Sequence, residues 1–273
     1  MPGQPTSGQI ALLVVSIAFF AAGGAVSLGR LWWDRAAMRI GTRVCMYGGL
    51  VTAIGVVAWH AAARGRWIPI EDNFDALVWL AILLALFVVY TQRTRPLRGL
   101  DWFVMPIVIL LLLGAGHFGT RDYHEYLYEN NAHKAWLWVH SATAYGGAVA
   151  FAVAAACGAM FLVGSRRLRR KQSAPWFGNL ERLEHMTMAA VVLGFALLTV
   201  GMVTGVVRWL NGTHVPVGKI TLSSLAWLAY AIVLHAPINP RFRGRKAAML
   251  SIFGFALMIA TLVAVQIVGA SKL

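Results

Sequence analysis

Histidines are the residues with which this chain could do chemistry, and four of the eight lie inside or at the ends of long apolar stretches. These four are His60, His117, His140 and His235. An ionisable side chain is costly at membrane depth, so a histidine there marks a candidate functional site. Neutral imidazole is a good axial ligand for haem iron, and a helical bundle can hold a porphyrin between two facing helices. A histidine at a helix end also has a simpler interpretation, as a polar residue that reaches lipid headgroups or water.

Other kinds of chemistry have less support. His124, His133 and His214 lie in polar segments and are interpreted as solvated side chains. The sequence contains no His-x-x-x-His zinc pattern, no G-x-S-x-G elbow and no phosphate-binding loop. Only Asp75 and Asp101 place a carboxylate close to an apolar stretch. This scarcity argues against a transporter that works through membrane-embedded acids.

The composition identifies lipid as the solvent of this chain. Hydrophobic residues make up 59% of the 273 residues and charged residues 12%, whereas a soluble globular domain carries about 25% charged residues. A chain this apolar cannot surround one core with a polar surface. The 11 Trp and 27 Gly residues fit the same class, because Trp anchors at bilayer interfaces and Gly is common in membrane helices.

Eight apolar stretches come close to the length that a hydrocarbon core requires, which is about 20 helical residues. The predicted helices are 10–28, 44–63, 74–90, 100–116, 135–163, 186–207, 220–235 and 247–269. The sequence therefore predicts an all-α fold, a polytopic membrane bundle of about eight transmembrane helices. We expect it to form a single membrane domain over residues 1–273.

The segments between the predicted helices alternate in charge. Most of the 24 Lys and Arg residues lie in 30–43, 93–98, 166–182 and 241–246, and the other segments also carry Asp and Glu. Basic loops stay in the cytoplasm, so both termini are predicted on the outer side of a bacterial cytoplasmic (inner) membrane. The net charge of +14 is then a topology signal with some attraction to membrane lipid. Nucleic acid is not expected as a partner.

Two local patterns concern the predicted helix 186–207. Asn179 is a plausible N-cap before it, because asparagine side chains accept hydrogen bonds from the first backbone N–H groups of a helix. Gly201 and Gly205 are four residues apart and therefore lie on one face. That spacing predicts the close approach of a neighbouring helix.

Aromatic and histidine positions in the second half of the chain carry a family resemblance. Trp136-Leu137-Trp138-Val139-His140 opens one predicted helix, Leu193-Gly194-Phe195 lies on the next, and Trp227 precedes Leu234-His235 on the one after. In these residues the chain resembles the integral-membrane cytochrome c assembly family. Members of that family handle haem and carry a tryptophan-rich outer loop. The resemblance extends over about residues 45–270 and is clearest after residue 136.

The resemblance implies roles for two histidines. His140 falls on an outer axial ligand of haem iron in the family, and His235 falls on its membrane-embedded ligand. A further family histidine falls near Trp67, where His60 is the histidine nearby. The outer loop, residues 208–218, contains a single tryptophan where the family has several. The chain ends at or before the position of the family's second outer ligand.

Three functions remain open on this sequence. The first is a haem-handling membrane protein of cytochrome c maturation. It would bind haem b through its histidines and present or pass it with other membrane proteins of a haem-delivery or respiratory complex. The second is a non-catalytic membrane protein that stabilises or regulates a membrane complex or tetrapyrrole synthesis without bound haem. A b-type cytochrome or a transporter is a third alternative.

The arrangement of ligands also has two alternatives. If haem binds on the outer side, His140 is the predicted ligand, with His60 or His117 as its partner because all three are expected at the same depth. The inner alternative is His235, paired with His185, which begins a helix on the cytoplasmic side.

Overall fold

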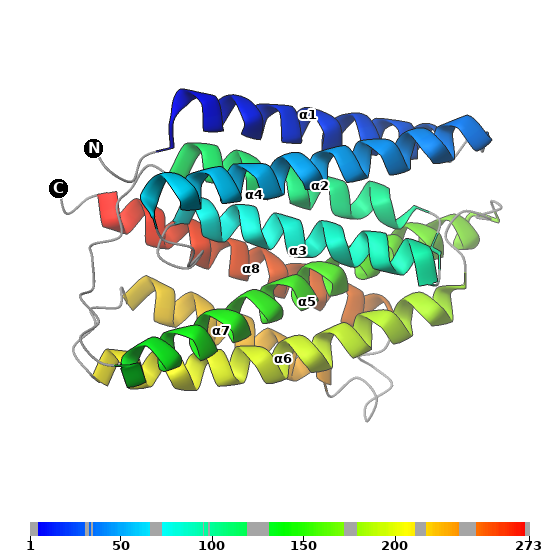
Figure 1. Ribbon diagram of the computed structural model, residues 1–273. Helices are drawn as coiled ribbons and strands as arrows, with labels where there is room; N and C mark the ends of the chain where they lie inside the picture. Colours follow the sequence, from blue (N-terminus) through cyan, green and yellow to red (C-terminus); the bar gives the residue numbers. More distant parts are fainter. Residues whose placement is uncertain are drawn as a thin grey trace. The chain divides into compact units, whose positions relative to one another are not determined.

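The computed structural model describes residues 5–30, 33, 35–65, 73–94, 96–97, 99–118, 131–171, 179–210, 217–234 and 244–270. Within these ranges the chain forms eight α-helices and no strand, which confirms the predicted all-α architecture (Figure 1). The helices are α1 (Ser7–Gly29), α2 (Ala36–Arg64), α3 (Asn73–Thr94), α4 (Leu100–Phe118), α5 (Asn131–Arg169), α6 (Leu180–Leu210), α7 (Val217–Leu234) and α8 (Arg245–Ala270).

Each predicted helix is present, and most are longer than the apolar stretch that predicted them. The largest extension is in α5, which was predicted over 135–163 and has 39 residues. At a rise of 1.5 Å per residue it is roughly 58 Å long, about twice the thickness of a hydrocarbon core. Apolar residues mark only the part of a helix that lies in hydrocarbon. The polar ends of the helices were therefore not predicted.

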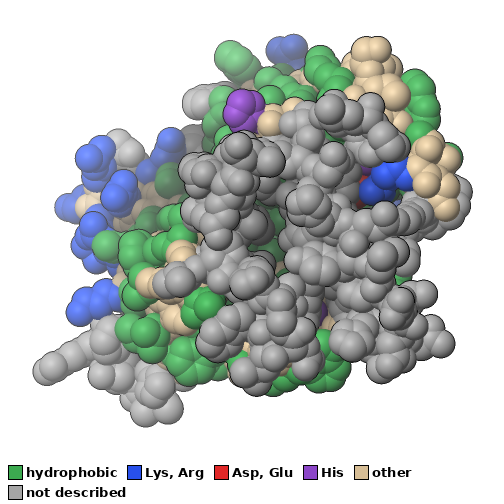
Figure 2. All heavy atoms as spheres, turned by 90° about the vertical axis from the view of Figure 1, so that its left-hand side faces the viewer, with side chains coloured by type: hydrophobic (Ala, Val, Ile, Leu, Met, Phe, Trp, Pro, Cys, Tyr) green, Lys and Arg blue, Asp and Glu red, His purple; other side chains and the backbone are tan. Residues whose placement is uncertain are grey.

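The helices have the length and surface of a multi-pass membrane protein. Over the described residues, α1 to α6 are long and apolar enough to cross a membrane, and α7 adds the shorter apolar stretch Ile220–Leu234. Large apolar side chains such as Val51, Leu110 and Phe253 are exposed. Hydrophobic side chains also cover much of the coloured surface in Figure 2. Such a surface suits lipid rather than water. The side of the membrane on which each terminus lies stays a prediction.

The chain divides into two compact units. The N-terminal unit is Met1–Glu125, with α1 to α4, and the C-terminal unit is Tyr126–Leu273, with α5 to α8. A single membrane domain over residues 1–273 therefore stays a prediction.

In the N-terminal unit, α1 and α3 each pack against both α2 and α4. α1 approaches α2 closely because Gly48 and Gly49 leave room for Phe19 and Phe20. A Cβ added at Gly49 would lie 2.9 Å from the ring of Phe20. Ser16 reinforces the contact by donating a hydrogen bond of 2.9 Å to the carbonyl oxygen of Gly49. This contact fixes α2, which carries one of the candidate histidines.

A buried carboxylate joins three helix ends of the same unit. Asp101, in the first turn of α4, is 3% exposed. It accepts a hydrogen bond of 2.7 Å from Nε2 of Gln92 on α3. It also lies 3.7 Å from the guanidinium of Arg30, the C-cap of α1. The ends of α1, α3 and α4 are thereby tied together, and none of the described partners of Asp101 is a histidine.

In the C-terminal unit, α5 and α7 each pack against both α6 and α8. Phe151 on α5 stacks on Tyr230 of α7, with ring centroids 3.5 Å apart and ring planes 8° apart. Gly194 on α6 and Gly254 on α8 make room for the two rings. A Cβ at these glycines would lie 2.7 and 2.8 Å from the nearest ring atoms. This core sets how closely α6 approaches α5, where His140 lies.

The beginning of α6 is capped as predicted. Oδ1 of Asn179 accepts a hydrogen bond of 2.9 Å from the backbone N–H of Glu181, which identifies Asn179 as the N-cap. The cap fixes where α6 starts. Gly201 and Thr204, which contact His140, follow about six to seven helical turns later, at about 3.6 residues per turn.

Candidate functional site

His60 is buried between α2 and α3 and is held by a charged partner. It is 1% exposed, and its Nδ1 lies 2.9 Å from Oδ1 of Asp75 on α3. The other carboxylate oxygen of Asp75 pairs with Nη2 of Arg64. The ring of Phe74 meets the imidazole edge-on, with centroids 5.0 Å apart. A histidine, a carboxylate and a guanidinium thus form one buried network, which we call the His60 network.

The local sequence explains why these three side chains meet. Arg64 follows His60 by four residues, so both lie on the same face of α2. Asp75 lies in the first turn of α3, where the helix dipole favours a negative charge. Asp75 itself is fully buried, and a buried charge requires a partner. Arg64 supplies that partner and leaves the second carboxylate oxygen to accept from His60.

His140 is held between α5 and α6 by neutral partners. Its Nδ1 lies 3.0 Å from the carbonyl oxygen of Gly201 and 3.0 Å from Oγ1 of Thr204. One turn earlier on α5, Nε1 of Trp136 donates a hydrogen bond of 3.3 Å to the carbonyl oxygen of Thr204. His140 is partly buried, and Trp136 and Trp138 beside it are 37% and 46% exposed.

The glycines of α6 make this contact possible. A Cβ added at Gly201 would lie 3.5 Å from Oγ1 of Thr143, and one at Gly205 would lie 3.4 Å from Cε1 of His140. Both glycines therefore face α5, which confirms the predicted close approach of a neighbouring helix. Since α5 begins at Asn131, His140 lies more than two turns inside the helix rather than in its first turn.

Both anchored histidines have the chemistry of a metal ligand. A carbonyl oxygen and a carboxylate paired with a guanidinium are hydrogen-bond acceptors, so Nδ1 of each imidazole is the donor. This leaves Nε2 as the ring nitrogen that would bind haem iron when the imidazole is neutral. Trp136 and Trp138 add exposed aromatic surface next to His140. The donor set of this chain therefore fits haem.

The remaining candidate histidines are exposed or lie outside the described residues. His117 is exposed near the end of α4, and His185 is exposed in the second turn of α6. His235 lies outside the described residues. The described part of the chain has no group of three or more His, Cys, Asp or Glu side chains that could hold a metal ion. Pairing of His140 with His60 or His117 stays a prediction.

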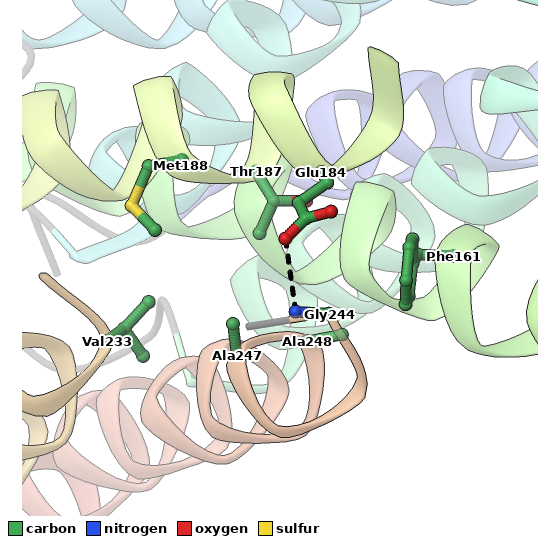
Figure 3. Close-up of a pocket in the computed structure, with 8 residues that line it drawn as sticks. All are labelled: Phe161, Glu184, Thr187, Met188, Val233, Gly244, Ala247 and Ala248. Atoms are coloured by element: carbon green, nitrogen blue, oxygen red, sulfur yellow. Dashed lines mark hydrogen bonds between the residues drawn. The ribbon is translucent and has the colours of Figure 1, made fainter. Parts of the chain in front are cut away.

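A small cavity in the C-terminal unit is a packing gap. It is lined by apolar side chains of α5 to α8 around Glu184 and Gly244 (Figure 3). Its volume of about 10 Å³ is close to that of one water molecule and excludes a porphyrin. Glu184 accepts a hydrogen bond of 3.1 Å from the backbone N–H of Gly244. Gly244, with φ of +63°, immediately precedes α8. This contact fixes the start of α8.

Three functional candidates were missed at the level of the sequence. Asp75 was considered only as an acid close to an apolar stretch, and Arg64 and Thr204 were not considered. A usable signal existed for the first two: Arg64 shares a helix face with His60, and Asp75 opens the next apolar stretch. No comparable signal marked Thr204, because threonine is a common residue in apolar helices.

The profile of the cytochrome c assembly protein family matches residues 67–271. This chain belongs to the cytochrome c assembly family. The matched range includes Asp75, His140 and His235 and begins after His60 and Arg64. The matched range thus contains His140 and both of its hydrogen-bond partners, Gly201 and Thr204, whereas α2 lies outside it.

Similar proteins include cytochrome c biogenesis proteins. Cytochrome c biogenesis protein CcsA of Prochlorococcus marinus (strain NATL2A) is 35% identical over 99 residues, which are 34% of this chain and 30% of that protein. The CcsA protein of Synechococcus sp. (strain WH7803) is 30% identical over 99 residues, again 34% of this chain and 30% of the relative. The chain thus matches less than a third of the length of these relatives. No solved structure matches this chain.

Proposed function

We propose that this member of the cytochrome c assembly family handles haem during cytochrome c maturation. It binds haem b through histidine and presents or passes it with other membrane proteins of a haem-delivery or respiratory complex. The observation that carries the proposal is the anchoring of His140. Its Nδ1 lies 3.0 Å from two acceptors on α6, within the range that the family profile matches. The relatives, named as cytochrome c biogenesis proteins, support the same process.

The residues around His140 would each have a separate role in binding haem. Haem supplies an iron centre that takes axial nitrogen ligands, and Nε2 of His140 would be one of them. Gly201 and Thr204 hold the imidazole ring in one orientation. The exposed indole rings of Trp136 and Trp138 offer aromatic surface on which a porphyrin can stack. His60, His117 and His235 are the proposed further ligands.

The proposal includes a location and a topology. The protein lies in the bacterial cytoplasmic membrane with both termini outside, because the basic segments then face the cytoplasm. His140, near the start of the apolar part of α5, is then at the outer side. Accessibility of single cysteines tests this topology: a cysteine at residue 130 should react from outside and one at residue 167 from inside. The reverse pattern would contradict it.

A second function is favoured by one feature of the sequence. The segment 208–218 has a single tryptophan, Trp209, where the resemblance leads us to expect several. A non-catalytic protein that stabilises or regulates a membrane complex or tetrapyrrole synthesis would not need that loop to hold haem. Such a protein would use the contacts of His140 only to join α5 to α6.

Haem content of matched histidine variants separates these functions. His140→Ala should insert in the membrane at the wild-type level but purify with a several-fold lower haem-to-protein ratio. His185→Ala, which removes an exposed histidine of α6, should keep the wild-type ratio. Haem loss in His185→Ala but not in His140→Ala would instead favour the inner pair with His235. Equal haem content in all variants would contradict a role for both pairs.

A further inference from the structure

The His60 network has more partners than a contact between two helices needs. His60 and Asp75 are 1% and 0% exposed, and they join α2 to α3 across a distance of 2.9 Å from Nδ1 to Oδ1. In the same unit, Asp101 joins α4 to α3 and to Arg30 without any histidine. A buried ion pair is therefore sufficient to fasten helices in this unit. The imidazole in the His60 network calls for another explanation.

The geometry of the network puts the imidazole of His60 beside a buried ion pair. Asp75 and Arg64 face each other in a site whose side chains are 0 to 14% exposed, and a buried charge requires a partner of opposite charge. Nδ1 of His60 lies 2.9 Å from the carboxylate of this pair.

Arg64 also fixes the direction in which Asp75 points. One carboxylate oxygen pairs with the guanidinium and the other receives Nδ1–H of His60. Because both oxygens are engaged, the carboxylate cannot turn away from the imidazole without breaking the ion pair. Metal-ligating histidines in proteins are oriented in this way by a carboxylate on their other nitrogen, which also makes them stronger donors.

A second observation on the same face of α3 also indicates a ligand. Trp79 follows Asp75 by one helical turn, and its indole N–H is buried with no hydrogen-bond partner among the described residues. A buried indole N–H usually has an acceptor. Haem brings two propionate carboxylates, either of which is an acceptor of this kind.

We infer that Asp75 is a positioning residue for haem: it holds His60, with Arg64 behind it, as an electron-rich axial ligand. The inference rests on the proposed function, since it requires that the protein binds haem. It goes beyond that function by assigning a role to a carboxylate and a guanidinium that bind no iron themselves. Arg64 and His60 lie before the range that the family profile matches, whereas Asp75 lies inside it.

The test compares two buried carboxylates of one unit. Asp75→Asn and Asp101→Asn are purified in detergent, and the haem-to-protein ratio, the midpoint potential and the rate of haem loss to apomyoglobin are measured. In Asp75→Asn the amide is a weaker acceptor for Nδ1–H, so the imidazole donates less electron density to iron. We expect a higher midpoint potential and a haem loss rate raised roughly ten- to hundredfold. Asp75→Glu, which keeps the carboxylate, should restore the potential at least in part.

The control is Asp101→Asn, which removes a carboxylate of similar burial that contacts no histidine. It should lower the melting temperature and leave the midpoint potential of haem unchanged. A loss of stability alone therefore cannot account for a raised midpoint potential in Asp75→Asn. His60→Gly offers a further check, because added imidazole should restore the low-spin spectrum if His60 is a ligand.

Two results would overturn the inference, and they are distinguishable. A wild-type protein that binds haem, with the same potential and loss rate in Asp75→Asn as in wild type, removes Asp75 from the haem site and leaves the proposed function standing. A wild-type protein that purifies without haem, even with ample haem supply, removes the inference and the proposed function together.

Discussion

His60 and His140 are anchored through the same ring nitrogen by opposite kinds of partner. His60 donates to a buried carboxylate that is neutralised by Arg64, whereas His140 meets a backbone carbonyl and a threonine hydroxyl. The first imidazole is almost fully buried and the second is partly exposed. His60 is thus part of a buried ion-pair network, whereas part of the imidazole surface of His140 stays exposed.

The difference has a consequence for haem. A carboxylate on Nδ1 makes the imidazole a stronger donor than a neutral acceptor does. If each histidine binds haem iron, His60 would therefore hold it more tightly than His140 would.

The largest expected effect comes from removing the cation of the His60 network. Arg64→Met leaves the buried carboxylate of Asp75 without its counter-charge, which typically costs about 3–5 kcal/mol in the free energy of unfolding. Thermal unfolding in detergent, followed by circular dichroism, measures the loss. Arg43→Met on the same helix removes an exposed arginine and should change the free energy by less than about 0.5 kcal/mol. Equal melting of the two variants would mean that charge does not hold His60.

The next largest effect comes from overpacking the contact between α6 and His140 on α5. Leucine at Gly201 or Gly205 must push α6 away from Thr143 or from the ring of His140, at a cost of about 1–3 kcal/mol. Gly205→Leu should also lower the haem content, since it displaces the imidazole. Gly218→Leu is the matched control, because nothing lies within 4 Å of a Cβ at that position. If all three variants had the same melting temperature, the contact between α5 and α6 would not depend on these glycines.

The smallest effect comes from removing one hydroxyl group. Thr204→Val takes away one of the two acceptors of His140 and leaves the carbonyl of Gly201. The loss of one hydrogen bond should cost about 1 kcal/mol in the free energy of unfolding and should speed haem loss slightly. Thr52→Val removes a hydroxyl that donates to carbonyl oxygens of its own helix and should leave haem retention unchanged. A comparable change in both variants would show that Thr204 has no particular role at His140.

The helices could be predicted from the sequence because a membrane-spanning helix needs only one signal, a long apolar stretch. All eight appear where that signal occurs, and the packing of Gly201 and Gly205 followed from their spacing alone. The ends were underestimated, as in α5, because polar residues at the interface continue the helix without adding to the apolar signal. The capping of α6 by Asn179 was predicted because a cap is a local contact.

The supports of the histidines could not be predicted in the same way. His60 and Asp75 are 15 residues apart on different helices, and their contact depends on how α2 and α3 are rotated about their axes. An apolar stretch does not fix that rotation, since most faces of such a helix are hydrophobic. Thr204 meets His140 across 64 residues for the same reason. Candidate histidines are visible in the sequence, whereas the groups that orient them are set by tertiary packing.

The central claim is that the anchored histidines bind haem, and the visible absorption spectrum of the detergent-purified wild-type protein tests it most directly. Expression with ample haem supply should give a coloured protein with the Soret and α bands of low-spin, bis-histidine haem b. The α band should shift or disappear in His140→Ala. A colourless wild-type protein, correctly inserted and folded by its circular dichroism, would contradict the account and favour the function without haem.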